Sequence, residues 1–453
     1  MKIHTLPNLA LGSLAAGLLA LAGLEAGGPP AMPQVTFRTI YTLGGVSQPG
    51  GLHEAEPGLF YSSGGSYNFF SINTKGAARQ LAPPPNANNF GGPPLPAANG
   101  RAYSGVGTGN TSAPFSVVSI TSQPGSMVTY PATGLNPALY QPLPNGTILA
   151  QASNVANGII SVATVDLGGN VTPVWQLPSW TDRIYSDVLY ASDGNYYGVS
   201  LTAFGGPPNE GSSYVFQVTP SGAMNNLLTL PNNVFNSATE GWIIQGSDGN
   251  LYMETPFGGA TGNGALYQIT LTGQSKIIYS YVKGPSAYPS AFIQASDGNF
   301  YGTTHGSGSN GVAEIYRLTL TGQYTSLHTM NGPDGQCGCT LIQGGDGVIY
   351  GTSDGGGSNG AGTVWALNAG LPKPAPQALS FQPTSGPPGT KVQIWGYNLL
   401  AASAQFNGVA ASAAHSSGPN YVIATVSKGA TSGPITITTP GGTSTTAASF
   451  TVN

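Results

Sequence analysis

The chain has 453 residues, a formal net charge of −4 and only 6% charged residues, against about 25% in an average soluble protein. Its 12 Lys and Arg residues form no basic footprint, which excludes nucleic acid as a partner. The 40% hydrophobic residues argue against disorder, and the 68 Gly and 37 Pro residues supply many turns. We therefore expect an all-β protein with many short strands.

The first 26 residues have the pattern of a secretory signal peptide. Lys2 precedes an apolar run from Leu9 to Leu24, and cleavage is expected after Ala26 or Ala22. The alternative is a membrane anchor, but the run is short for a bilayer span and is diluted by small residues. We predict an exported protein, extracellular or at the cell surface, with no transmembrane segment in the mature chain.

A tandem repeat follows the signal peptide. The clear copies are "ASDGNYYGVS", "GSDGNLYMET", "ASDGNFYGTT" and "GGDGVIYGTS", with turn glycines at Gly194, Gly249, Gly298 and Gly347, and weaker copies place Gly58, Gly100 and Gly146 at the turn. Three residues after these glycines lie Tyr61, Tyr103, Leu149, Tyr197, Tyr252, Tyr301 and Tyr350. The next residue is small in six of the seven copies, and Met253 is the exception.

Each copy contains four strand-like runs in about 48 residues, which is typical of a propeller blade. The last copy ends with its third strand, "GTVWALNAG" (Gly362 to Gly370), and an orphan strand, "VTFRTIYTL" (Val35 to Leu43), precedes the first copy. We predict that this orphan strand completes the last blade. It would then close a seven-bladed β-propeller over residues 34–371 and remove its exposed sheet edges.

The turns of the clear copies contain the aspartates Asp193, Asp248, Asp297 and Asp346. Glycine suits the left-handed position of a tight turn, and aspartate can bond nearby backbone amides, so we interpret these aspartates as structural turn residues. Calcium would need several oxygens from one loop, and each copy offers a single carboxylate, so we predict no metal. The aromatic residue should pack between blades, and the small residue after it should let the next sheet approach.

The units, for example Ile293–Gly322, resemble the GloVer-type tandem repeats of exported bacterial proteins of the choice-of-anchor kind. The likeness extends over about Tyr185–Gly370. The resemblance implies export and often a C-terminal surface anchor, and it implies no established reaction.

A Pro-rich linker from Gly370 to Gln377 leads to a C-terminal module over residues 377–453. Its short strands and regular turns predict a small β-sandwich. The segments "SGPPGT", "FNG" and "TPGG" resemble the IPT/TIG domain, which implies an immunoglobulin-like fold. Some members of that family bind DNA, but Lys391 and Lys428 are the only Lys or Arg residues of this module. We expect a spacer or an interaction module.

The sequence contains no HExxH metalloprotease motif, and its glycine-rich stretch "GGGSNGAG" (Gly355 to Gly362) is expected to join two strands rather than open a helix. We therefore interpret this stretch as a blade loop and predict no cofactor. The two cysteines, Cys337 and Cys339, have one residue between them. A disulfide with this spacing would be strained, and whether the two residues form one stays open.

One face of the predicted propeller carries short turns, and the opposite face carries long loops, where function usually lies. We predict that this long-loop face binds ligand through Trp180, Tyr185, Phe235, Tyr288 and His305. Exposed aromatic rings suit sugar rings or peptides. The alternative is that these rings cap the blades.

The same face holds Asp187 and Glu240, the best candidates for a catalytic pair. A glycosidase would need two such carboxylates about 5–9.5 Å apart. We favour an exported, non-catalytic binding or surface-interaction protein whose ligand is a glycan or a surface protein. The alternatives are a secreted polysaccharide lyase or glycosidase and a purely structural envelope protein.

Overall fold

The computed structural model shows strands, turns and loops in the part of the chain that it describes. The described residues are 34–44, 50–64, 68–82, 89–90, 92–97, 99–107, 116–123, 125–130, 134–154, 156–177, 183–184, 186–201, 213–230, 234–235, 242–282, 288–305, 313–335, 337–416 and 418–453. The predicted signal peptide lies outside them. Within these ranges nothing qualifies as a membrane-spanning helix.

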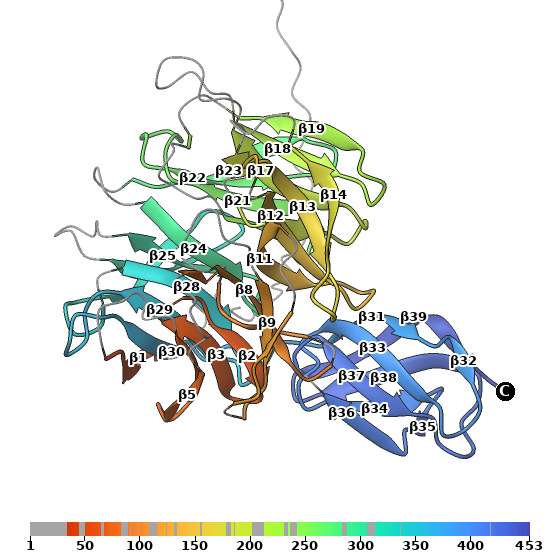
Figure 1. The fold of residues 1–453 in the computed structure, drawn as a ribbon. Coiled ribbons are helices and arrows are strands. Elements are labelled where there is room, and N and C mark those ends of the chain that lie inside the picture. The colour runs from red at the N-terminus through yellow and green to blue at the C-terminus, as the bar shows by residue number, and fades with distance from the viewer. Residues whose placement is uncertain are drawn as a thin grey trace, which may run out of the picture. The chain divides into compact units, whose positions relative to one another are not determined.

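The repeat copies form a series of antiparallel sheets, each of four or five strands, which is a β-propeller-like arrangement (Figure 1). The first three sheets contain β2 (His53–Glu56), β3 (Leu59–Gly64), β4 (Asn68–Asn73) and β5 (Ala78–Ala82); β6 (Asn89–Phe90), β7 (Leu95–Pro96), β8 (Ala102–Gly107), β9 (Ser116–Ile120) and β10 (Val128–Thr129); and β11 (Leu135–Pro142), β12 (Ile148–Asn154), β13 (Ile160–Val165) and β14 (Val171–Gln176).

The remaining four sheets of the repeat region are formed by the four clear copies. They contain β15 (Arg183–Ile184), β16 (Leu189–Tyr190), β17 (Tyr196–Leu201), β18 (Ser213–Val218) and β19 (Met224–Thr229); β20 (Trp242–Gln245), β21 (Leu251–Thr255), β22 (Ala265–Ile269) and β23 (Ser275–Ser280); β24 (Tyr288–Gln294), β25 (Phe300–His305), β26 (Glu314–Leu318) and β27 (Tyr324–Thr329); and β28 (Cys337–Gln343), β29 (Ile349–Asp354) and β30 (Thr363–Asn368). A single pairing between His305 and Cys337 joins the last two sheets.

The strand that completes the last of these sheets comes from the start of the repeat region. β1 (Thr36–Thr42) pairs antiparallel with β30, and Phe37 lies opposite Leu367. The ring of Phe37 also stacks on His328 of β27, with ring centroids 3.8 Å apart. The predicted pairing of the N-terminal strand with the third strand of the last copy is confirmed.

Each clear turn is tied to the aromatic residue that follows it. Gly298 has a φ angle of 80°, and the Asp297 carboxylate before it accepts a 3.0 Å hydrogen bond from the Asn299 backbone N–H. The other oxygen of Asp297 accepts a 3.0 Å hydrogen bond from the Tyr301 hydroxyl. The same hydroxyl bonds join Tyr197 to Asp193 at 2.7 Å, Tyr252 to Asp248 at 2.9 Å and Tyr350 to Asp346 at 2.7 Å.

In three of the clear copies the residue after the aromatic is a glycine, Gly198, Gly302 or Gly351, and it makes room inside its own sheet. A Cβ added to Gly302 would lie 2.3 Å from the Tyr316 hydroxyl oxygen, and one added to Gly351 would lie 2.1 Å from the Trp365 ring. Both rings come from the residue directly opposite on the next strand. The expectation that this small residue admits the next sheet is therefore wrong, because the ring that fills the space belongs to the same sheet.

A side chain near the end of the first strand joins successive sheets. The Gln294 side-chain oxygen accepts a 2.7 Å hydrogen bond from the backbone N–H of Ser247 in the preceding copy, and its nitrogen donates to the Gly298 carbonyl. Equivalent bonds run from Ser192 to Gln245 at 2.8 Å, from Ser296 to Gln343 at 2.8 Å and from Gly345 to Glu54 at 2.7 Å. We term these four contacts the inter-sheet clasps, and the last of them joins the final copy to the first.

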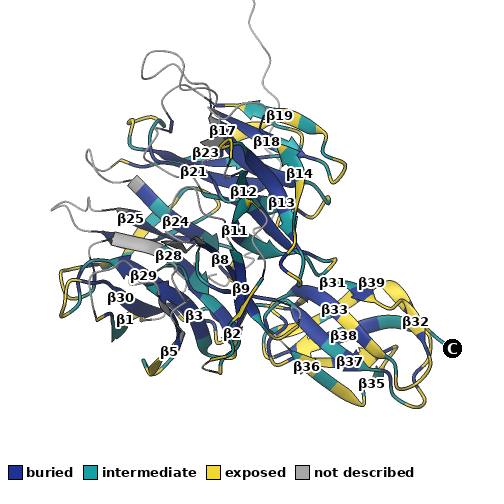
Figure 2. Cartoon of the chain, viewed as in Figure 1, coloured by how far each residue is buried: buried dark blue, intermediate teal, exposed yellow. Residues whose placement is uncertain are grey.

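The apolar core of the repeat region lies between successive sheets. One cluster joins Tyr301 and Ile315 to Leu341, Ile349 and Trp365 of the next sheet, all at most 5% exposed. Tyr301 therefore packs between neighbouring sheets, as the sequence predicts. Figure 2 shows buried residues along the strands, whereas many exposed residues lie at the turns.

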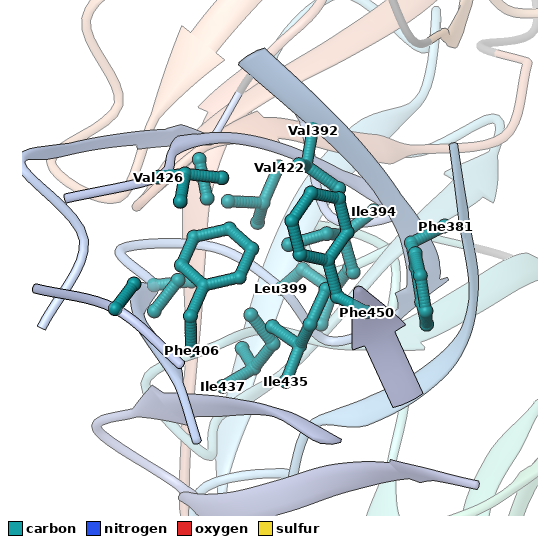
Figure 3. Close-up of a cluster of buried hydrophobic side chains, with 14 residues drawn as sticks. Phe381, Val392, Ile394, Leu399, Phe406, Val422, Val426, Ile435, Ile437 and Phe450 are labelled. Carbon is teal, nitrogen blue, oxygen red and sulfur yellow. The ribbon is translucent and has the colours of Figure 1, made fainter. Parts of the chain in front are cut away.

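Residues 377–453 form two sheets around a separate core, which is the arrangement of a β-sandwich. The sheets contain β31 (Gln377–Gln382), β33 (Lys391–Tyr397), β37 (Tyr421–Thr425) and β36 (Ala413–Ser416); and β32 (Ser385–Gly386), β39 (Gly442–Val452), β38 (Gly433–Thr439), β34 (Ser403–Phe406) and β35 (Val409–Ala410). Their inward side chains meet in one cluster, where the rings of Phe406 and Phe450 have centroids 5.3 Å apart (Figure 3).

The linker and the sandwich contact the short-turn side of the repeat sheets. The Ser380 hydroxyl donates a 2.9 Å hydrogen bond to the carbonyl of Pro144 in the turn of the third copy, and the Gln141 side chain donates one of 2.6 Å to the Tyr397 hydroxyl. In the linker, the Pro372 carbonyl accepts a 2.5 Å bond from the Ser296 hydroxyl. Hydrogen bonds thus join both the linker and the sandwich to the repeat sheets.

Candidate functional site

The structure describes part of the predicted ligand-binding face. Trp180, Tyr185 and Glu240 lie outside the described residues. Tyr288 begins β24 and His305 ends β25, and the two residues are partners across these strands. The fold therefore brings their backbones together, while their side chains lie outside the description.

Phe235 is a buried residue. It is 6% exposed and packs in an apolar cluster with Val234, Leu230 and Tyr267, between two successive sheets. Burial of so large an apolar surface is favourable, and a ring held in this way presents no face to a ligand. The prediction that Phe235 is an exposed ligand contact is therefore wrong. Its ring packs against the sheets, as the alternative of a capping residue describes.

Asp187 is half-buried in the segment before β16. The neighbouring Ser186 hydroxyl accepts a 2.8 Å hydrogen bond from the backbone N–H of Val199 and donates one of 2.8 Å to the Asp187 carbonyl, which holds this segment against β17. Because Glu240 lies outside the described residues, the separation of the two carboxylates stays a prediction.

A carboxyl group that the sequence did not single out lies between the sheets β20–β23 and β24–β27. Glu254 of β21 is 2% exposed, and its Oε1 accepts hydrogen bonds from the hydroxyls of Tyr281 and Tyr316. The two hydroxyl oxygens are 2.8 Å apart. Oε2 of Glu254 has no hydrogen-bond partner in the described part of the chain. We term these three residues the buried Glu–Tyr site.

The electrostatics of this site follow from its burial. Desolvation raises the pKa of Glu254 to about 7, although the two hydroxyl bonds act in the opposite direction. Burial also raises the pKa of Tyr281 and of Tyr316 well above 10, so both hydroxyls keep their protons and remain donors. Glu254 can therefore change its charge near neutral pH while its two partners do not.

The surroundings of the site are aromatic. Tyr324 stacks on Tyr279 with ring centroids 5.4 Å apart and on Tyr316 with centroids 5.1 Å apart. The Tyr324 hydroxyl donates a 3.0 Å hydrogen bond to Glu314, which is itself 6% exposed. This layer of rings keeps water away from Glu254 and explains the strong desolvation of its carboxyl group.

Two departures from the repeat pattern mark the site in the sequence. At the position of Glu254 the other copies have Ser63, Gly105, Gln151, Val199, Thr303 and Thr352. At the position of Tyr281, directly after the fourth strand, the structure places Leu43, Leu177, Leu230 and Met330 in other copies. A comparison of these columns could have indicated a polar contact between the fifth and sixth copies.

A lone carboxyl group with two hydroxyl donors can take up and release a proton, but it offers too few ligands for a metal ion. Across the described residues no group of His, Cys, Asp and Glu side chains could hold a metal. Two adjoining cavities of about 470 Å³ each lie where the linker and the sandwich meet the repeat sheets. Glu54 and Lys373 line one of them, and Arg101 and His415 line the other.

The comparison with known proteins supports the repeat. A sequence profile described as the Gloeobacter/Verrucomicrobia repeat matches residues 184–387. The strand arrangement and this match together define a β-propeller-like tandem-repeat protein. The resemblance to the GloVer-type repeat is confirmed over the matched residues. No curated protein matches the chain.

Several solved structures share a similar arrangement at low identity. A fungal alcohol oxidase of the AA5 family, in complex with copper, has 13% identity and a TM-score of 0.47, covering 92% of this chain and 98% of that one. A gluconolactonase from Xanthomonas campestris has 11% identity and a TM-score of 0.40, covering 74% and 90%. The computationally designed Ika8 protein has 10% identity and a TM-score of 0.42, covering 72% and 99%.

Proposed function

We propose that this chain is an exported, non-catalytic binding protein. Its scaffold is a seven-bladed β-propeller over residues 34–371 that is closed by β1, followed by an IPT/TIG domain over residues 377–453. The long-loop face of the propeller binds a glycan or a surface protein. Residues 1–26 act as the signal peptide that directs the chain out of the cell.

The proposal is carried by the contacts on the opposite, short-turn side. The linker and the sandwich bond there to Pro144, Gln141 and Ser296, and the Trp395 ring lies 3.6 Å from where a Cβ on Gly146 would stand. A partner that approached the turns of the third and sixth copies would have to displace these contacts. The long-loop face is then the accessible end of a rigid scaffold, where binding loops usually lie.

Aromatic residues on that face suit a sugar ring or a peptide, because their rings bury large areas at a small cost in conformational entropy. Trp180, Tyr185, Tyr288 and His305 are the proposed contacts. Phe235 does not belong to this set, since its ring is buried.

A glycan array of the mature chain, followed by product analysis on the hits, tests this function. Binding without turnover is the expected result, and Trp180→Ala should lower the affinity about tenfold or more, as loss of an aromatic contact at a binding hot spot does. The matched control is Leu320→Ala, which truncates an exposed apolar residue in a short turn.

Cleavage of a hit that is lost in Asp187→Ala or Glu240→Ala would replace the proposal by the glycosidase or lyase alternative. Failure of the array and of a parallel screen against surface proteins would leave the purely structural role.

A further inference from the structure

We propose that the buried Glu–Tyr site is a proton-controlled contact between two neighbouring sheets. The contact is tight while Glu254 holds its proton, and it loosens when that proton leaves. The site thereby makes one seam of the repeat region sensitive to pH around neutrality.

The hydrogen bonds of the site account for this behaviour. A protonated Glu254 is a neutral group among rings, and its Oε1 accepts from both tyrosine hydroxyls. Loss of the proton places a full negative charge on a side chain that is 2% exposed. One carboxylate oxygen then accepts two hydrogen bonds, and the other has no hydrogen-bond partner among the described residues. An ionised carboxylate that is buried without a counterion is unfavourable, so the two sheets lower the free energy by parting.

The groups around Glu254 provide no compensating charge. Tyr279 and Tyr281 approach from β23 and the residue after it, and Tyr316 and Glu314 belong to β26. Tyr324 belongs to β27, and the nearby residues of β22, β24 and β25 in the same cluster are Leu266, Phe292 and Phe300. Within this described set no cation is present, and the one additional ionisable acid is Glu314.

The position of the site along the strands determines which end of the seam responds to pH. Glu254 is the penultimate residue of β21, and the chain then enters the long connection to β22. Tyr281 directly follows β23, and Tyr316 is the middle residue of β26. Glu254 and Tyr281 therefore lie toward the long-loop end of the seam, and Tyr316 contacts them from the middle of its strand. The switch acts on that end whether or not a ligand binds there.

The sign of the effect follows from linkage. The pKa of Glu254 in the folded chain, about 7, lies above its ordinary value of 4.5. The stability contributed by the site is fully present below pH 4.5 and is lost as the pH rises through 7. With these two values, the local opening equilibrium should increase on the order of 30-fold between about pH 5.5 and pH 8.

Hydrogen exchange measured by mass spectrometry on the mature chain tests the switch, with protection factors corrected for the intrinsic exchange rate at each pH. Peptides that cover β21, Tyr281 and β26 should lose protection between about pH 5.5 and pH 8. Peptides from the sandwich should show no comparable change. In Glu254→Gln, which keeps the acceptor oxygen and cannot ionise, the difference should vanish.

Two further variants separate the switch from a general weakening of the seam. Glu314→Gln changes the neighbouring carboxylate, leaves Glu254 in place, and should keep the pH dependence. Tyr316→Phe removes one of the two donors that favour the carboxylate, so the midpoint of the transition should shift to higher pH. Equal protection at both pH values in the unchanged chain would overturn the proposal, and so would a pH dependence that survives Glu254→Gln.

Discussion

At the scale of single residues, one tyrosine in each clear copy joins the turn to the core. The Tyr301 ring is 2% exposed between two sheets, and its hydroxyl bonds to Asp297 of the preceding turn. The ring and the hydroxyl contribute separately to stability. The ring excludes water between the sheets, while the hydroxyl holds the hairpin in register with that packing.

Substitutions at Tyr301 can separate these two contributions. Tyr301→Ala should lower the free energy of unfolding by about 3–5 kcal/mol, as other truncations of buried aromatics do. Tyr301→Phe keeps the ring and should cost only about 1 kcal/mol for the lost hydrogen bond. Denaturant unfolding at constant pH measures both values. Equal losses in the two variants would show that the hydroxyl bond, and not ring packing, dominates.

At the scale of elements, β1 is the strand whose removal should lower the thermal stability of the repeat region most. Deletion of residues 34–43 from the mature chain removes the strand that pairs with β30 and leaves an exposed sheet edge. We expect the melting temperature to fall by several degrees or more and aggregation to increase, as followed by calorimetry and light scattering.

A synthetic peptide with the deleted sequence should restore part of the lost stability, and a scrambled peptide should not. An unchanged melting temperature in the deletion variant would mean that the pairing contributes little to the stability of the last sheet.

The repeat pattern predicted the strands, the turns and the β1–β30 pairing, because each depends on local periodicity or on matching strand content. It failed for contacts that depend on where side chains point across strands and sheets. The space above Gly302 is filled by Tyr316 of the same sheet, and Glu254 meets Tyr316 across two sheets. Neither contact follows from spacing along the chain, since the partners belong to different strands.

At the scale of the whole molecule, the inter-sheet clasp of Glu54 joins the first copy to the last. Glu54 is 8% exposed, and its two oxygens accept hydrogen bonds from the backbone N–H groups of Gly58, at 2.8 Å, and Gly345, at 2.7 Å. The corresponding residue in the fifth, sixth and seventh copies is Gln, whose nitrogen donates to a turn carbonyl, as Gln343 does to Gly347. A carboxylate suits the first copy because both of its partners are donors.

This chemistry predicts that the two residue types are not interchangeable. Glu54→Gln should destabilise the chain by about 1–3 kcal/mol, because a hydrogen bond from a backbone N–H group to a charged carboxylate is lost and that N–H group then faces an amide nitrogen. Gln343→Glu, the reciprocal change, should also destabilise it, because a carboxylate then faces the Gly347 carbonyl. Denaturant unfolding measures both variants. An unchanged free energy of unfolding in Glu54→Gln would indicate that the contact between the last and first copies adds nothing to stability.

The candidate site was predictable only in outline. Long loops and aromatic residues identified one face, and the backbones of Tyr288 and His305 do lie together on it. The burial of Phe235 could not be predicted, because an aromatic ring in a loop is compatible with exposure or with packing. The contacts of Ser380 and Tyr397 with the third copy were equally hidden, since they join residues more than two hundred positions apart.

The pairing of β1 with β30 also determines the order in which the protein can be completed. During synthesis β1 is made before any repeat copy, whereas its partner is made after almost all of them. β1 therefore stays without its native strand partner until β30 has been made, and we expect this non-local pairing to be a slow step. A nascent chain that stalls before Thr363 carries at its beginning a strand whose native partner has not yet been made.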